Sequence, residues 1–279
     1  MRKVVFVSFA NSKYHSSLDR IDKETIAFNF NQRFFLSEKD LSQEYVAIMR
    51  PKLYRRGYGY WMWKPYLIEK ILNQINDDDI LVYSDSGVIW NGKGLEIYNS
   101  YIKEIEKDKL DFMIFNQPFL EKDWTKKDIF NYLKINDMNV CMSLQIWAGC
   151  IFIRKTPKSY DLIKKWLLIC SEHPNLIRDK ISNSSNYLGF EENRHDQSVF
   201  SLLIKSSLGI KSNVHQWSEI QTIDEDWNRL KKNPIIAKRV YRNSSKHNFC
   251  DKLIKVRNMF IGYYLKYIMK FDFKNNPSW

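Results

Sequence analysis

An acidic residue follows a short apolar stretch in residues 80–87, which read ILVYSDSG. A buried strand ending here would present the Asp85 carboxylate at its carboxyl end, in a position to hold a hard divalent cation. Such a cation neutralises a nucleotide diphosphate and stabilises it as a leaving group. The alternative is structural, with Asp85 starting a turn that Gly87 completes.

Residues 54–65 read YRRGYGYWMWKP and combine five aromatic residues, two glycines and the cations Arg55, Arg56 and Lys64. Aromatic faces can stack on a base or a sugar ring, and Arg and Lys bind phosphate. A helix that begins at Pro65 would also offer free N–H groups to an anion. A packed aromatic loop is the alternative, but the combination favours a binding site.

Residues 191–198 read EENRHDQS and precede an apolar stretch typical of a helix. Asp196 is a candidate general base, or a carboxylate that positions an acceptor hydroxyl. Asp196 or Ser198 could instead cap the first amides of the helix, and the two interpretations are compatible.

Other catalytic patterns are missing from the sequence. The five histidines show no HExxH or paired spacing, and the chain has no GxSxG, Walker or GxGxxG motif. A zinc hydrolase is therefore disfavoured. His247, which lies among cations after the main body of the chain, is the histidine of most interest.

These segments need strands and helices to bring them together. The apolar periodicity predicts strands over residues 3–10, 80–84, 111–116 and 146–154, and helices over residues 65–75, 94–107, 158–170 and 196–204. Such alternation predicts an α/β domain with a mainly parallel sheet. Ligands of these sheets lie beyond the carboxyl ends of the strands, where Asp85 is expected.

The net charge of +12 is concentrated at one end of the 279-residue chain. Residues 229–279 hold 13 basic and 2 acidic residues, which leaves 31 basic and 30 acidic residues in the first 228. A nearly neutral body with a basic tail disfavours a uniformly basic nucleic-acid coat. The apolar run after Met1 is too short for a signal peptide, and the unpaired spacing of the four cysteines indicates reduced thiols in a cytoplasm.

The basic tail has the pattern of an amphipathic helix. On a helical wheel of residues 252–271, Lys252, Lys255, Lys266 and Lys270 share one narrow sector and apolar residues fill most of the rest. This pattern suits the plane of an anionic membrane. A helix packed on the body with solvated lysines is the alternative.

In this order the segments resemble bacterial nucleotide-sugar-dependent glycosyltransferases of the GT-A type, which add sugars to surface polysaccharides such as O-antigen, capsule or lipooligosaccharide. The resemblance is carried by residues 57–65 (GYGYWMWKP), 79–87 (DILVYSDSG) and 194–203 (RHDQSVFSLL), and it spans residues 1–250. The first block is quite specific, and the last is shared more loosely with other GT-A families.

The resemblance implies a GT-A-like, Rossmann-type single catalytic domain over residues 1–230, followed by a basic amphipathic helical extension over residues 231–279. Asp196 would be catalytic. The donor would be bound by Arg56, Tyr60, Trp61, Trp63, Lys64, Tyr83 and Asp85, and the acceptor by Trp147, Gly149 and His195.

The resemblance also implies a bound Mn²⁺ or Mg²⁺, held by Asp85 and His247, with His215 as the second choice for the histidine. Tyr83 replaces the first acidic residue of the usual Asp-x-Asp motif, which argues against a strong dependence on metal.

The implied activity is transfer of a hexose from a nucleotide sugar, a UDP-sugar, to a growing bacterial surface glycan or an undecaprenyl-linked acceptor. The enzyme would be peripheral on the cytoplasmic face of the plasma membrane, without a nucleic-acid partner. Two alternatives are a nucleic-acid-binding protein that uses the basic tail, and a non-catalytic membrane-associated scaffold with a degenerate transferase fold.

Overall fold

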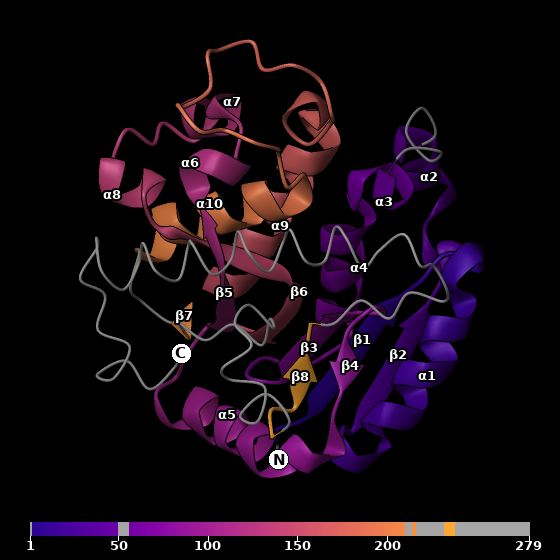
Figure 1. The fold of residues 1–279 in the computed structure, drawn as a ribbon. Helices are drawn as coiled ribbons and strands as arrows, with labels where there is room; N and C mark the ends of the chain where they lie inside the picture. Colours follow the sequence, from indigo (N-terminus) through magenta and orange to yellow (C-terminus); the bar gives the residue numbers. More distant parts are fainter. Residues whose placement is uncertain (1, 50–55, 210–213, 216–231, 238–279) are drawn as a thin grey trace, which may run out of the picture.

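A six-stranded sheet forms the centre of the computed structural model, which describes residues 2–49, 56–209, 214–215 and 232–237 (Figure 1). The strand order is β2-β1-β3-β6-β5-β7. The strands are β1 (Val4–Phe9), β2 (Gln32–Leu36), β3 (Ile80–Asp85), β5 (Phe112–Leu120), β6 (Leu144–Arg154) and β7 (Val214–His215). Within this described sheet β6 alone runs against its neighbours, so the prediction of a mainly parallel sheet is confirmed.

Helices cover both faces of the sheet, and Figure 1 shows α9 and α10 above it and α5 below. One face carries α2 (Gln43–Met49), α4 (Trp63–Leu72), α9 (Pro157–Glu172) and α10 (Asp196–Leu208). The other face carries α1 (His15–Thr25) and α5 (Leu95–Lys107). Four short helices are α3 (Arg56–Tyr60), α6 (Glu121–Trp124), α7 (Lys127–Tyr132) and α8 (Met138–Cys141).

Local sequence explains the elements that frame the site. The first five residues of β3 are buried, as expected of a central strand covered on both faces, and only Asp85 at its end is partly exposed. Helix α9 begins with a capping box, in which Thr156 accepts from the Ser159 N–H at 3.1 Å and the Ser159 hydroxyl accepts from the Thr156 N–H at 3.0 Å. Because Asp85 is the last residue of β3, the acidic end of this strand lies at the carboxyl edge of the sheet.

The body extends beyond residue 230. Residues 232–237 include β8 (Ile235–Ile236), which pairs antiparallel with β4 (Ile89–Trp90), and Ile235 is fully buried. The remainder of the expected extension, residues 238–279, lies outside the described residues, as does His247. Its assignment to membrane attachment stays a proposal.

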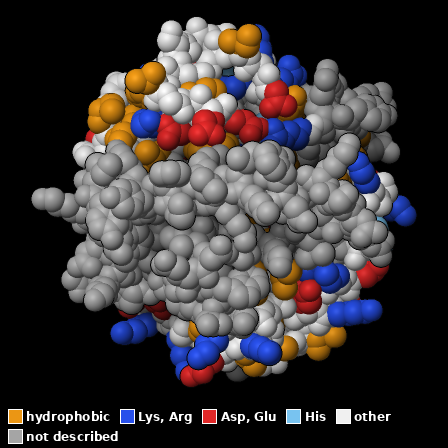
Figure 2. Space-filling view, in the orientation of Figure 1, with side chains coloured by type: hydrophobic (Ala, Val, Ile, Leu, Met, Phe, Trp, Pro, Cys, Tyr) orange, Lys and Arg blue, Asp and Glu red, His pale blue; other side chains and the backbone are white. Residues whose placement is uncertain are grey.

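Surface charge on the body is mixed. On the described part of the face in Figure 2, acidic and basic side chains lie close together above and below the grey region. In the described ranges no helix combines the length and the apolar character that a membrane span requires. The described cysteines Cys141, Cys150 and Cys170 are all buried.

Candidate functional site

One buried lysine brings together three of the residues that the sequence singles out. The Lys64 Nζ atom lies 3.3 Å from Asp85 Oδ1 and 3.2 Å from Asp196 Oδ2, and it donates a hydrogen bond to the Ala148 carbonyl at 3.0 Å. Lys64, Asp85 and Asp196 are called the Lys64 triad below. The side chains of Lys64 and Asp196 are 3% and 4% exposed, whereas that of Asp85 is 34% exposed. Asp85 is thus the member of the triad that reaches solvent.

The triad is assembled from the ends of three elements. Lys64 lies in the first turn of α4, Asp85 ends β3 and Asp196 begins α10. One interpretation of the sequence is that Asp196 or Ser198 caps α10. In the structure the N-cap residue is His195, and its side chain makes no capping hydrogen bond. The Asp196 carboxylate faces Lys64 instead. The Ser198 hydroxyl donates to the Trp124 carbonyl at 2.8 Å.

Burial and charge act against each other in the triad. Burial favours a neutral Lys64, but the Asp196 and Asp85 carboxylates outweigh it and raise the pKa of Lys64. Burial raises the pKa of Asp196 to about 7, with Lys64 opposing the rise and Asp85 adding to it. One ammonium can neutralise only one carboxylate, so the more buried carboxyl group holds its proton more tightly. The triad therefore contains a group that exchanges a proton near neutral pH.

Tyr83 supports Asp85 from within the strand. Its hydroxyl donates to Asp85 Oδ1 at 2.6 Å, and its ring lies 5.4 Å from the Lys64 ammonium. Burial, together with the nearby Asp85 charge, raises the pKa of Tyr83 well above its usual value, so it remains a donor. Tyr83 is fully buried and fixes the orientation of Asp85.

The GYGYW segment forms a left-handed turn that leads into Lys64. All five residues, 57–61, have positive φ, between 53° and 89°. Left-handed backbone disfavours non-glycine residues by about 1–2 kcal/mol each, so Tyr58, Tyr60 and Trp61 are strained. Gly57 has a second reason to be glycine, since a Cβ atom there would overlap the Trp61 ring. Such strain persists only where the surroundings over-determine the conformation.

Aromatic packing holds this turn against α10. The His195 ring lies 5.2 Å from the Tyr60 ring and 5.3 Å from the Trp61 ring, with the Trp61 pair stacked. Arg56, at the start of the turn, forms an ion pair with Glu192. Burial lowers the pKa of His195. His195, expected on the acceptor side, therefore packs with two residues expected on the donor side.

Trp63, which the resemblance assigns to donor binding, is a buried residue in the structure. It is 5% exposed, its ring lies 4.0 Å from that of Phe9, and its Nε1 donates to the Gly57 carbonyl at 3.1 Å. Trp63 thus packs in the core and supports the left-handed turn.

A glutamine network, which the sequence analysis missed, fixes β6 beside the triad. Gln197 accepts from the Ala148 N–H at 3.1 Å and donates to Gln117 and Gln145 at 2.9 and 2.6 Å. The Ala148 peptide is thus held by Lys64 at its oxygen and by Gln197 at its nitrogen. Gln197 follows Asp196 directly, and this adjacency was the available sequence signal.

Trp147 and Gly149, the expected acceptor residues, lie on this fixed segment of β6. Ser84 of β3 pairs with Cys150, so residues 147–149 run past the end of β3 beside Asp85. Trp147 is buried, and its indole ring occupies the space that a Cβ atom on Gly149 would need. Their role in acceptor binding stays a prediction.

We expect Gly149→Ala to destabilise the protein by about 1–3 kcal/mol, because the new methyl group must displace a packed indole. Urea unfolding monitored by tryptophan fluorescence measures the change. Gly87→Ala is the matched control, since a Cβ atom there meets no atom within 4 Å. Equal stabilities of the two variants would contradict the close approach at Gly149.

The contacts around Asp85 are compatible with metal binding by one of its two carboxylate oxygens. The contacts from Tyr83 and Lys64 both go to Oδ1, so a cation would be met by Oδ2. The proposed partner His247 lies outside the described residues, and no side-chain position is described for His215. Asp85 could hold the metal, and the Lys64 ammonium already supplies positive charge beside it.

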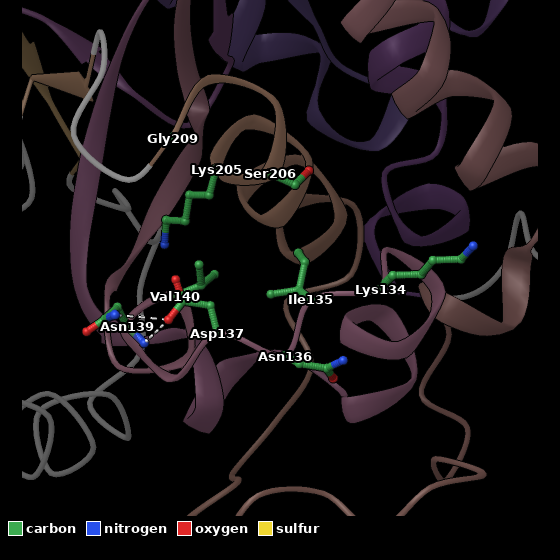
Figure 3. Close-up of a pocket in the computed structure, with 9 residues that line it drawn as sticks. All are labelled: Lys134, Ile135, Asn136, Asp137, Asn139, Val140, Lys205, Ser206 and Gly209. Carbon is green, nitrogen blue, oxygen red and sulfur yellow. Dashed lines mark hydrogen bonds between the residues drawn. The ribbon is translucent and has the colours of Figure 1, made fainter.

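A cavity of about 750 Å³ lies elsewhere, between α7, α8 and the end of α10 (Figure 3). Its lining includes Asp137, Val140, Lys205 and Gly209 and contains no member of the Lys64 triad. The chemistry-bearing residues and this cavity are therefore separate features.

No protein-family model and no curated protein matches the sequence. Among solved structures, a glycosyltransferase involved in glycosylation of the major capsid of PBCV-1 covers 91% of this chain and 99% of its own, at 12% identity and a TM-score of 0.49. The galactosyltransferase LgtC, with donor and acceptor sugar analogs, covers 92% and 94%, at 13% identity and 0.45. Mouse xyloside xylosyltransferase 1 covers 86% and 87%, at 10% identity and 0.44. Likenesses at this level assign neither a substrate nor a residue role to this chain.

Proposed function

We propose that this protein is a glycosyltransferase that moves a hexose from a nucleotide sugar to a hydroxyl group of a glycan. The observation that carries the proposal is the Lys64 triad, in which two carboxylates from distant segments converge on one buried ammonium at the carboxyl edge of the sheet. This edge is where nucleotides bind in open α/β sheets. The strained aromatic turn beside it adds ring faces suited to a base or a sugar.

In the proposed reaction, the bond from the sugar C1 to the phosphate oxygen breaks and a bond from C1 to the acceptor oxygen forms. The nucleoside diphosphate leaves, and the acceptor hydroxyl gives up its proton. Asp85, the partly exposed carboxylate, faces the donor, and its ion pair with Lys64 holds it in place. Asp196 takes the acceptor proton. Because Asp196 is buried, the side chains over it must move when substrates bind.

A divalent cation at Asp85 would neutralise charge on the departing diphosphate. Asp85 is the described residue that would hold it, and His247 is its proposed partner. The Lys64 charge and the Tyr83 hydrogen bond orient Asp85 with or without that cation.

The finer assignments rest on the sequence. The resemblance of residues 57–65 and 79–87 supports a UDP-sugar donor and a bacterial surface glycan, growing or undecaprenyl-linked, as the acceptor. The basic amphipathic pattern of residues 252–271 supports attachment to the cytoplasmic face of an anionic membrane.

A thermal-shift screen with UDP-, GDP-, CMP- and dTDP-sugars, each with and without Mn²⁺, tests the proposal. A donor at 100 times its Kd stabilises the native state by about 2.7 kcal/mol. For a chain of this size that corresponds to a rise in Tm of roughly 5–10 °C. Free hexoses are the control, and Asp85→Asn should reduce the shift.

Turnover is measured in the same samples as release of the nucleoside diphosphate. If no nucleotide sugar raises Tm or is hydrolysed, with or without Mn²⁺, the glycosyltransferase proposal fails. Binding without turnover of any donor and acceptor pair would favour the scaffold alternative.

A further inference from the structure

A second cluster of side chains, separate from Asp85, joins three parts of the segment between α9 and α10. Asp179 and Glu192 lie in this segment, and His195 is the N-cap of α10. One potential ligand atom from each residue lies within 4.8 Å of the others. The cluster thus offers one imidazole nitrogen and two carboxylates at short range.

The imidazole of His195 is set up to accept a ligand at Nε2. Its Nδ1 lies 2.7 Å from the Ile177 carbonyl, and a carbonyl only accepts, so Nδ1 carries the proton. The lone pair is then on Nε2, which is buried and has no hydrogen-bond partner among the described residues. Asp179 Oδ1 is 3.7 Å away. A backbone carbonyl bound to the far nitrogen is the usual support of a metal-ligating histidine.

The charge and the geometry of the cluster also fit a divalent cation. Two carboxylates match its charge, and bound ligand atoms about 2.0–2.2 Å from a metal lie roughly 3–3.5 Å from each other. The cluster must contract by about 1 Å to reach this spacing. Asp179 and Glu192 can make that movement, since their side chains are 49% and 35% exposed and both lie outside helices and strands.

We propose that Asp179, Glu192 and His195 form a site for a transition metal, with Zn²⁺ as the preferred ion. An imidazole with carboxylates suits Zn²⁺ better than Mg²⁺ or Ca²⁺, which favour all-oxygen sites. Three protein ligands leave a coordination position for water. The site does not include Asp85, so it stands whether or not the proposed transferase reaction is correct.

The resident counter-ion of the cluster is Arg56, which pairs with Glu192. A metal bound to Glu192 competes with this pair and releases the guanidinium. Because His195 also packs against Tyr60 and Trp61, the metal would tie the left-handed turn to the start of α10.

The test is titration of the chelator-treated full chain with ZnCl₂ by calorimetry and with CoCl₂ by visible absorption. We expect one site. Asp179→Asn and His195→Gln should each weaken Zn²⁺ binding at least 10-fold, and Arg56→Ala should tighten it. Asp161→Asn, an exposed carboxylate on α9, is the matched control and should leave the affinity unchanged.

The outcome does not depend on the buried histidine alone. If His195→Gln fails to fold, the Zn²⁺ affinity of Asp179→Asn tests the proposal by itself. Asp179 is half-exposed, so this change removes a ligand without disturbing the core. The proposal is overturned if the wild-type chain binds no Zn²⁺, if Asp179→Asn binds as tightly as wild type, or if bound Co²⁺ shows thiolate charge-transfer bands from the cysteines.

Discussion

Lys64→Met is expected to destabilise the folded protein by about 3–5 kcal/mol near neutral pH, because Asp85 and the buried Asp196 lose the cation that lies between them. Methionine keeps most of the volume of the lysine chain, so packing changes little. The same change should abolish sugar transfer, because Asp85 and Asp196 lose the group that sets their spacing.

A double-mutant cycle separates the charge effect from packing. In Lys64→Met/Asp196→Asn the remaining charge is Asp85, which is 34% exposed and can be hydrated. The double variant should therefore be more stable than the sum of the single changes indicates, by about 1–3 kcal/mol. Urea unfolding measures all four proteins, with the exposed Lys165→Met as control. Strictly additive losses would contradict the electrostatic account of the triad.

Asp196→Asn is expected to lower kcat for transfer by about 10²–10⁴-fold, the usual contribution of a general base. The amide has the same shape but cannot accept the acceptor proton. The fold should persist, since Lys64 still pairs with Asp85 and the amide can accept from the ammonium. Steady-state kinetics with the donor found in the screen, and a Tm measurement, check both parts.

Two comparisons make the Asp196 result specific. Asp161→Asn, a surface change on α9, should leave kcat unchanged. Asp85→Asn should instead raise the KM for the donor, because Asp85 faces the donor. If Asp196→Asn retains wild-type kcat, Asp196 is not the base, even if the protein proves to be a glycosyltransferase.

Local sequence predicted much of the fold. Each of the four predicted strands and four predicted helices is present, because long apolar periodicity and a capping signal such as Thr156-Pro157 act within a few residues. Helix α1 and strand β2 were not predicted. Only Leu18, Ile21 and Thr25 are buried in α1, and β2 is a short edge strand with one buried residue, so both patterns are weak.

The sequence by itself determined the residue types of the site: acidic residues at the end of β3 and at the start of α10, and an aromatic, basic segment that leads into α4. Tertiary structure alone decided that Lys64 lies between Asp85 and Asp196, that Trp63 packs in the core, and that Asp179 approaches His195. The physical reason is distance along the chain. Burial, ion pairing and pKa depend on neighbours that only folding brings within a few ångströms, and no local pattern encodes which neighbours these are.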